Sequence, residues 1–256
     1  MKQFKFIASS LFILLVVSSC KKEKMSAAVV PASAKLSKVE YVGSTSVANY
    51  SYNAQGRLSE IKDNYYTYKY DYTNGTPVIE IYNNSTGIIE SKLSQIALSS
   101  NKISQYTYYA HNDQGQPYNG YNTNFQYDAN GFQVSRTYGG YEYITEVTNG
   151  NMTKQTVKNS GTVSRTFTFE FYTDKPNKFN LNLQEEWYGN YIVDNTLFGN
   201  KNTNLIKRVT IQSAARTEVK DFTYVTNADN YVMEQTISTS VNGAAPTAYT
   251  TKFTYQ

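Results

Sequence analysis

A short hairpin unit, Phe125–Val134, constrains the fold of this chain more than any other feature. Phe125 and Tyr127 are separated by one polar residue, so both side chains point to the same face of an extended strand. The next four residues, Asp-Ala-Asn-Gly at 128–131, suit a type I turn. Asp accepts hydrogen bonds from the backbone ahead of it, and Gly takes the left-handed position that closes a G1-bulged hairpin. The unit therefore predicts two antiparallel strands with an aromatic face.

Related units recur along the chain. The best copy is Tyr50–Leu58, and less regular copies lie at 68–78, 106–115, 144–152 and 222–232, with an incomplete copy at 253–255. In the copy at 222–232, Asn230 stands where Gly is usual, and Asn tolerates the left-handed conformation better than most residues. Each copy predicts one hairpin of two strands and a turn.

The residues between these units also favour strands. β-Branched and aromatic residues alternate with polar ones, and no helical pattern follows residue 20. Tyr is the main apolar residue, with 25 copies against 12 of Phe and one of Trp. A Tyr can bury its ring while its hydroxyl stays in water, which suits a thinly covered sheet. We predict an all-β fold with a single large curled antiparallel meander sheet over residues 36–256; the alternatives are a β-sandwich or a partly closed barrel.

The first twenty residues indicate export. Lys2 and Lys5 precede an apolar run, which ends in Val-Ser-Ser-Cys at 17–20. This ending resembles the lipobox of bacterial lipoproteins. The resemblance implies cleavage before Cys20, a diacylglycerol on its sulfur and an acylated amino terminus; an ordinary secretory signal with an incidental Cys is the alternative. We therefore predict a signal peptide at 1–19, and a lipidated Cys20 with a flexible tether at 20–35.

Cysteine and charge exclude two classes of protein. Cys20 is the single cysteine, so disulfide bonds cannot stabilise the exported domain. The net charge of the chain is +4 at pH 7. Lys2 and Lys5 account for two of these charges and residues 21–24 for the other two, so residues 25–256 are neutral. We therefore expect a membrane contact through the lipid anchor and no binding of nucleic acid.

One segment, residues 174–204, interrupts the alternation and is rich in Asn. About thirty residues without a regular pattern are unusual in a compact domain, unless they form a plug or serve function. The segment contains Trp187, Tyr188 and Tyr191, whose rings are candidates for stacking on sugars. The alternative is that these rings pin the segment to the sheet. We predict a long excursion across one face of the sheet, with a helical turn around 184–188.

No catalytic set is recognisable in the sequence. His111 is the single His, and it lacks the partners of a zinc site or a catalytic triad. A glycosidase needs two carboxyl groups about 5 Å or roughly 6.5–9.5 Å apart. The adjacent residues Glu185 and Glu186, with Asp174 and Asp194 in the same excursion, do not provide that spacing by themselves. We predict no catalytic residue, no metal site and no cofactor.

The hairpin units also carry a resemblance to known proteins. Tyr50–Leu58 and Phe125–Val134 resemble the YD repeats of Rhs-type shells, whose core is Tyr-x-Tyr-Asp-x-x-Gly-x-Leu. With its lipobox and its excursion ending in Asn-Leu-Ile-Lys at 204–207, the chain is similar to a family of Bacteroidota outer-membrane lipoproteins of unknown function. The resemblance implies a curled antiparallel sheet and a lipid-anchored position at the outer membrane. Residues 21–24 match poorly the acidic signal for display on the cell surface, so the surface and the periplasmic face both stay open.

These observations favour a non-catalytic binding or interaction protein of the cell envelope, with a glycan or an envelope protein as its partner. One alternative is a structural component that assembles with copies of itself. A further alternative is an enzyme that acts on glycosides.

Overall fold

The computed structural model describes residues 34–73, 75–178 and 197–256. Within these ranges the chain forms sixteen strands and no helix. The strands are β1 (Leu36–Tyr41), β2 (Val47–Tyr52), β3 (Leu58–Lys62), β4 (Tyr66–Asp71), β5 (Val78–Asn83), β6 (Ile89–Ser99), β7 (Lys102–His111), β8 (Pro117–Tyr127), β9 (Gln133–Tyr138), β10 (Tyr141–Thr148), β11 (Asn151–Asn159), β12 (Thr162–Pro176), β13 (Asn204–Ser213), β14 (Thr217–Thr226), β15 (Val232–Val241) and β16 (Thr247–Tyr255).

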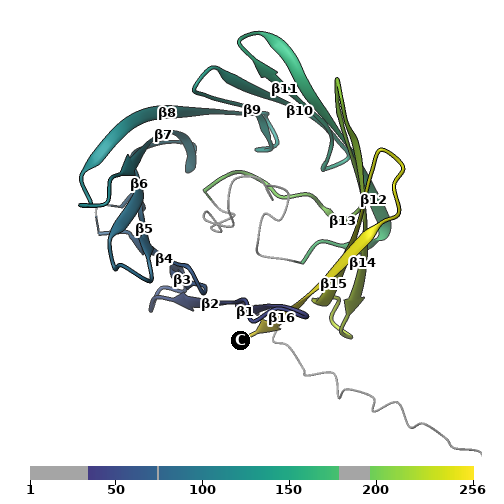
Figure 1. Ribbon diagram of the computed structural model, residues 1–256, viewed down its shortest axis with the longest axis horizontal. Coiled ribbons are helices and arrows are strands. Elements are labelled where there is room, and N and C mark those ends of the chain that lie inside the picture. Colours follow the sequence, from purple (N-terminus) through teal and green to yellow (C-terminus); the bar gives the residue numbers. More distant parts are fainter. Residues whose placement is uncertain (1–33, 74, 179–196) are drawn as a thin grey trace, which may run out of the picture.

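The strands form one closed barrel (Figure 1). Each strand pairs antiparallel with its neighbours in the chain, and β1 also pairs with β16, with Leu36 opposite Tyr255. The predicted all-β antiparallel meander is confirmed. The predicted open, curled sheet is wrong, and the barrel alternative applies in a fully closed form. Because the first and last strands pair, the sheet has no free edge for another chain to extend.

The meander gives the barrel two different ends. We call the end where β1 begins and β16 finishes the proximal end, and the opposite end the distal end. The distal connections are all short, whereas the proximal connection between β12 and β13 spans residues 177–203. Backbone groups of Lys35 and Gln256 exchange two hydrogen bonds of 3.0 and 2.9 Å at the proximal end. Residue 35, which we expected in the tether, therefore belongs to the barrel.

The predicted repeat turns are confirmed in their local geometry. The backbone nitrogen of Phe132 donates to Asp128 Oδ1 at 2.8 Å, and Gly131 has a φ of 82°. At the turn that begins at Asn227, the nitrogen of Tyr231 donates to the Asn227 side chain at 2.9 Å. Asn230 takes the expected left-handed conformation there, with a φ of 62°. The repeat therefore encodes hairpin turns, most of which lie at the proximal end.

The copy at 144–152 folds differently from its relatives. Asn149 and Gly150 have φ values of 50° and 74°, which is the two-residue type I′ turn. Gly139 and Gly140, at 52° and 83°, connect β9 to β10 in the same way. This turn type matches the right-handed twist of the strands it joins, so it fixes the register of each hairpin.

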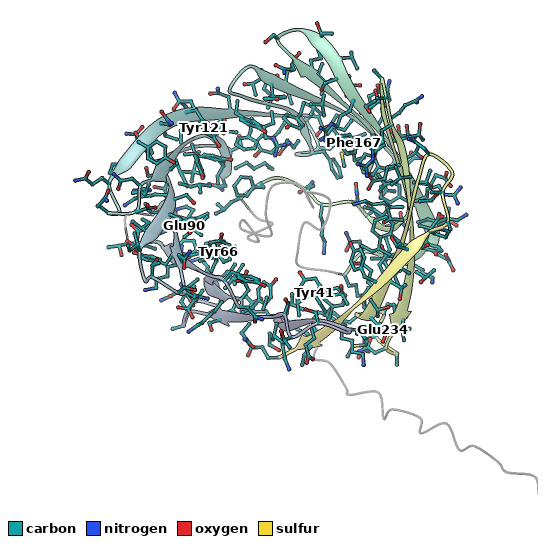
Figure 2. All side chains as sticks on the ribbon, in the orientation of Figure 1. Tyr41, Tyr66, Glu90, Tyr121, Phe167 and Glu234 are labelled. Carbon is teal, nitrogen blue, oxygen red and sulfur yellow. The ribbon has the colours of Figure 1, made fainter. Side chains whose placement is uncertain are left out.

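One face of the wall is buried and lines the interior. Along β4, Tyr68 and Tyr70 are buried, whereas Lys69 between them is exposed. The buried residues form two large clusters, one centred on β1–β6 and the other on β10–β15. Figure 2 shows Tyr41, Tyr66 and Phe167 on the inner side of the ring, and Glu234 on the outer side. The apolar face of the sheet therefore points inward.

Residues 197–203 cross the interior at the proximal end (Figure 1). The carbonyl of Leu197 accepts from Ile103 N at 2.7 Å, and Asn202 Oδ1 accepts from Met152 N at 2.6 Å. The Phe198 ring packs edge-on against Phe125, with centroids 5.6 Å apart. This part of the predicted excursion therefore lies on the inner face of the wall, against strands β7, β8 and β11.

The regular strands extend further into the predicted excursion than we expected. Asp174 belongs to β12, which continues to Pro176, and Asn204 begins β13. The helical turn predicted around 184–188 lies outside the described residues. Cys20 and the signal peptide at 1–19 also lie outside them.

Candidate ligand-binding surface

The distal mouth of the barrel exposes aromatic side chains that point inward. Tyr121 lies opposite Tyr108, which lies opposite the buried Leu93, so these three residues share the inner face. Tyr121, Tyr141 and Tyr249 are nevertheless 39%, 37% and 44% exposed. An eight-stranded barrel is about wide enough for its own side chains to fill, and sixteen strands enclose a much wider space. These inner rings therefore meet solvent at the distal mouth.

Five of the inner tyrosines form a continuous row, which we call the tyrosine ladder: Tyr108 on β7, Tyr121 on β8, Tyr138 on β9, and Tyr141 and Tyr143 on β10. The ring centroids of Tyr108 and Tyr121 are 4.9 Å apart, with an interplanar angle of 28°. Those of Tyr121 and Tyr138 are 5.7 Å apart at the same angle. Tyr138 also stacks on Tyr141 and Tyr143, each with centroids 5.7 Å apart.

The ladder follows from the hairpin register. The turn at Gly139 and Gly140 places Tyr138 directly opposite Tyr141. The register of β7 and β8 places Tyr108 opposite Tyr121. Stacked aromatic pairs each contribute about 0.5–1.5 kcal/mol beyond the area they bury, so the ladder orders the distal wall. Because the rings stack on one another, their hydroxyl groups and exposed edges are what remains for a ligand.

A buried cation supports the ladder. Arg136 on β9 lies opposite both Phe125 and Tyr143, so it also faces inward. Its guanidinium carbon lies 4.1 Å from the centre of the Tyr143 ring, and the hydroxyls of Tyr138 and Tyr143 are 3.1 Å apart. A guanidinium over an aromatic face is an attractive contact, and it fixes the ring orientation. The inner wall thus combines aromatic rings, hydroxyl groups and a positive charge.

The outer face is different in character and carries paired charges. Directly opposite residues form ion pairs between neighbouring strands: Glu80 with Lys92 at 2.8 Å, Glu146 with Lys154 at 2.9 Å, Glu142 with Lys158 at 3.1 Å, and Asp221 with Arg208 at 2.6 Å. A barrel that spans a bilayer instead shows lipid an apolar band about 25 Å tall. The polarity of this wall is the reverse of that pattern.

Few of the residues singled out from the sequence fall in the described structure. Trp187, Tyr188 and Tyr191, the predicted ligand-binding residues, lie outside it, as do Glu185, Glu186 and Asp194. Asp174 is exposed near the proximal end of β12. His111 is the last residue of β7, opposite Pro117, and is half-buried.

The described residues contain neither a metal site nor a membrane-spanning helix. No group of three or more His, Cys, Asp or Glu side chains in the described ranges has the geometry to hold a metal ion. The same ranges contain no helix of the length and apolarity needed to cross a membrane.

Sequence reasoning missed the tyrosine ladder, although a signal for it was present. The segment Tyr138–Tyr143 reads Tyr-Gly-Gly-Tyr-Glu-Tyr. A two-residue Gly-Gly turn pairs the flanking tyrosines across a hairpin and places Tyr143 on the same face. To predict the other two members, Tyr108 on β7 and Tyr121 on β8, one needs the register of a second hairpin. The connection between these strands is longer and polar, so the sequence does not show which residues lie opposite each other.

The fold is similar to one described in solved structures, and sequence comparisons gave nothing. No family model matches the chain, and no curated protein matches it. The barrel is similar to the crystal structure of a porin-like protein from Bacteroides uniformis ATCC 8492, with a TM-score of 0.64. The two chains are 15% identical, and the match covers 86% of this chain and 98% of the other. At this identity the similarity shows a common fold.

Proposed function

We propose that this protein is a lipid-anchored, non-catalytic binding protein of the cell envelope, and that its distal mouth takes up a glycan. The observation that carries the proposal is the tyrosine ladder, which faces inward and meets solvent in a barrel whose outer face is charged. Phenol hydroxyls and ring edges suit a polyhydroxylated ligand, because they offer hydrogen bonds and apolar contact together. The porin-like protein of similar fold supports an envelope location for this chain.

The polarity of the wall supports a barrel that stands in water and is held at the outer membrane by lipid. An ion pair that faces lipid would lose its hydration without a compensating gain, so the outer charges favour an aqueous setting. The segment before Lys35 joins the barrel at its proximal end. If Cys20 is lipidated, the distal mouth and its ladder therefore point away from the membrane. This arrangement leaves the mouth accessible to a ligand.

The alternative of self-assembly has less support in this fold. Every strand in the described part of the chain pairs on both sides, so none of these strands has a free edge to join a second copy. Assembly through a sheet face stays a prediction, as does an enzyme built on Glu185 and Glu186. The proposed role of Trp187, Tyr188 and Tyr191 in ligand binding also stays a prediction.

A binding experiment tests the proposed function. The mature chain with Cys20→Ser is screened against an array of neutral oligosaccharides, and hits are measured by calorimetry. Tyr121→Ala combined with Tyr141→Ala should weaken binding of a hit about tenfold, since it removes two hydroxyl groups and two ring edges from the ligand, and each hydrogen bond contributes about 0.5–1.5 kcal/mol. Tyr65→Ala removes a ring that is 67% exposed in the connection between β3 and β4, and should leave affinity unchanged. Absence of any glycan bound by the unmutated barrel would contradict the proposal.

A further inference from the structure

One contact is repeated around the proximal end of the barrel, where a Lys or Arg side chain lies over a tyrosine ring. We call the proximal connections, with the strand residues next to them, the proximal rim. In the shortest contact the guanidinium carbon of Arg57 lies 4.1 Å from the centre of the Tyr72 ring, and in the longest the ammonium of Lys102 lies 6.0 Å from that of Tyr127. The cations of these contacts, which we call the rim cations, are Lys35, Arg57, Lys102, Lys175 and Lys178.

The rim cations are spread around the barrel. Lys35 and Arg57 directly precede β1 and β3, and Lys102 begins β7. Lys175 lies at the proximal end of β12, and Lys178 lies just beyond it. Figure 1 shows β1, β7 and β12 on three different sides of the ring. A flat surface brought against this end of the barrel would therefore meet several rim cations at once.

Neutral groups hold the rim cations in place. The Lys35 ammonium donates to the carbonyl of Gly56 at 2.8 Å, and the Lys178 ammonium donates to the carbonyl of Asp229 at 2.6 Å. Within the described ranges, none of the five rim cations takes part in an ion pair. A ring face or a carbonyl orients a cation without cancelling its charge, so the rim cations can still attract an anion.

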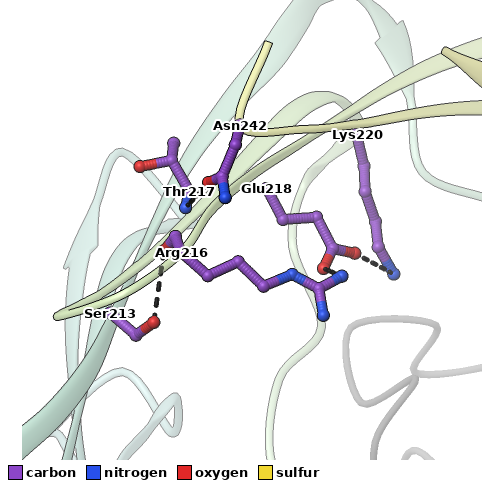
Figure 3. Close-up of polar contacts among 6 residues, drawn as sticks. All are labelled: Ser213, Arg216, Thr217, Glu218, Lys220 and Asn242. Atoms are coloured by element: carbon purple, nitrogen blue, oxygen red, sulfur yellow. Dashed lines mark hydrogen bonds and ion pairs between the residues drawn. The ribbon is translucent and has the colours of Figure 1, made fainter. Parts of the chain in front are cut away.

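Cations at the distal end are held differently (Figure 3). Arg216, in the connection before β14, donates through Nη2 to Glu218 Oε2 at 2.5 Å. Lys220 Nζ lies 3.8 Å from Oε1 of the same carboxylate, and the Ser213 hydroxyl donates to the carbonyl of Arg216 at 3.2 Å. A carboxylate of the protein therefore compensates the charge of these distal cations, whereas the rim cations have only rings and carbonyls.

Carboxylates are also present at the proximal rim, and two of them are engaged in turns. The described carboxylates there are those of Asp71, Asp128, Asp174 and Asp229. Asp71 accepts from the nitrogen of Thr73 at 2.9 Å, and Asp128 accepts from that of Phe132 at 2.8 Å. None of these four forms an ion pair with a rim cation. The rim cations are therefore available to an anion from outside the protein.

The position of the tether indicates which anion this is. Residue 35 joins the barrel at the proximal end, so the segment that leads back to Cys20 leaves from the rim. If Cys20 carries the proposed lipid, the surface of the bilayer faces the rim. Lys and Arg are attracted to anionic headgroups, and tyrosine rings gather at the same level of a membrane. The pairs of cation and tyrosine at the rim have this composition.

We infer that the proximal rim is a docking surface for anionic phospholipid headgroups, whose phosphates bind the rim cations. This inference takes only the lipid anchor from the proposed function and does not depend on glycan binding. A guanidinium binds phosphate oxygens through paired hydrogen bonds, and an ammonium binds them as a point charge. Contacts on several sides of the rim hold the barrel upright on the membrane, with the distal mouth facing away from it.

Flotation with phospholipid vesicles tests the inference. The protein is the mature chain with Cys20→Ser, so that no lipid anchor contributes to binding. One set of vesicles is phosphatidylcholine alone, and the other contains about 30% phosphatidylglycerol, which is anionic. The rim variant is Arg57→Gln plus Lys178→Gln, since both side chains are exposed. The matched control is Lys62→Gln plus Lys252→Gln, which removes two exposed cations from the distal end of β3 and from β16.

We expect the unmutated chain to partition into the anionic vesicles at least about tenfold more than into the neutral ones at about 50 mM salt, and to lose most of this preference at roughly 300 mM. The rim variant should partition into the anionic vesicles about tenfold less than the unmutated chain, whereas the control should match the unmutated chain. Thermal unfolding of each variant confirms that the barrel is folded.

Hydrogen exchange on the vesicles shows which end of the barrel docks. Amide exchange should slow in the proximal connections at 53–57 and 227–231, and stay unchanged in the distal connections at 84–88 and 242–246. Slower exchange at the distal connections alone would overturn the inference.

Three results of the flotation experiment would also overturn the inference. They are equal partitioning into the two sets of vesicles, an equal loss in the control, and full anionic binding by the rim variant, which would assign binding to the basic tether at 21–24. None of them affects the proposed glycan function, because calorimetry with an oligosaccharide reports on the distal mouth. A chain that binds no glycan but docks through its rim would lose the proposed function and keep this inference.

Discussion

The hydroxyl of Tyr127 donates a hydrogen bond of 2.8 Å to the backbone carbonyl of Ile103 on the neighbouring strand. The contact recurs around the proximal end, where Tyr52 donates to Leu36, Tyr172 to Phe222 and Tyr255 to Val232, at 2.8, 2.8 and 2.9 Å. Cations cover several of the rings: the ammonium of Lys35 lies 5.2 Å from the centre of the Tyr52 ring, and that of Lys175 lies 4.5 Å from Tyr172. In the copies at 50–58, 125–134 and 253–255, the second aromatic residue thus ties one strand of the barrel to its neighbour, and Tyr172, outside the repeat, does the same between β12 and β14.

Tyr127→Phe should lower the free energy of unfolding by about 1 kcal/mol, because it removes one hydrogen bond and leaves the Ile103 carbonyl with an unmet acceptor. Urea denaturation of the mature chain measures the change. Tyr118→Phe is the control, since the Tyr118 ring is half exposed at the distal end. An equal change in the free energy of unfolding for the two substitutions would show that the hydrogen bond of the Tyr127 hydroxyl does not stabilise the barrel.

Gly199→Ala should dislodge the segment that crosses the proximal interior. Gly199 has a φ of 89°, and a Cβ atom there would lie 2.7 Å from the carbonyl oxygen of Gly131 and equally close to the Tyr127 ring. Both the backbone conformation and the contact oppose a side chain, so we expect a loss of about 2 kcal/mol or more in stability. Hydrogen exchange at Asn200 and Thr203, whose nitrogens donate to Gly131 and Gly150, should speed up. Gly243→Ala, also at positive φ but with open space around it, separates the backbone strain from the clash.

The Glu80 ion pair should make stability depend on acid pH. Burial acts to raise the pKa of the Glu80 carboxyl, but hydrogen bonds from Lys92 and the Tyr82 hydroxyl outweigh it and lower the pKa below its ordinary value of 4.5. Ionised Glu80 therefore stabilises the folded barrel above that value, and the gain is lost as the pH falls through the lowered pKa.

Glu80→Gln should reduce the free energy of unfolding at pH 7 by less than about 1 kcal/mol, since the pair is partly exposed. The difference from the unmutated chain should shrink as the pH falls through the lowered pKa of Glu80, because the carboxyl then becomes protonated in the folded as well as the unfolded chain. A series of urea denaturations from pH 7 into the acid range measures it. Glu40→Gln, which breaks the more exposed pair with Lys38, controls for the loss of one surface carboxylate. A difference that persists in acid would rule out the ionised pair as its source.

The outer charges predict how the barrel behaves without the proposed lipid anchor. The mature chain with Cys20→Ser should be released by cells in soluble form and stay monodisperse without detergent, because its outer face carries ion pairs instead of an apolar band. Sedimentation and size-exclusion chromatography with light scattering measure this. If Cys20 carries the proposed lipid, the chain with Cys20 intact should partition into detergent. If the Cys20→Ser barrel precipitates unless detergent is added, its outer face contacts lipid in the native protein, and the prediction is wrong.

Local features of the fold could be predicted from the sequence, and closure could not. The turn at Asp128 and the left-handed Asn230 follow from side-chain chemistry within four residues, so the repeat reveals them. The pairing of Leu36 with Tyr255 joins the two ends of the domain, and no short motif records such a contact. The curvature of the sheet also depends on how many hairpins lie side by side. None of the 25 tyrosines of the chain carries information about that number.

The candidate site was harder to predict for a related reason. Trp187 was a candidate for ligand binding because it lies in the irregular segment, and binding residues often lie in such segments. The ladder instead uses residues of the regular hairpins, such as Tyr121 and Tyr138, which are ordinary strand residues in the sequence. Their importance depends on which side of the wall is the inside, and only the closed barrel decides that.

The pairing of β1 with β16 also has a consequence for how the chain reaches its native state. Strand β1 cannot complete its hydrogen bonds until β16 is in place, so the barrel cannot finish folding before the residues of β16 are available. Contacts between distant parts of a sequence form slowly, since a long loop must close first. During that interval β1 is an unprotected edge, and a partner that shields nascent strands would raise the yield of folded protein. Truncating β16 should accordingly leave an aggregation-prone chain rather than a slightly smaller barrel.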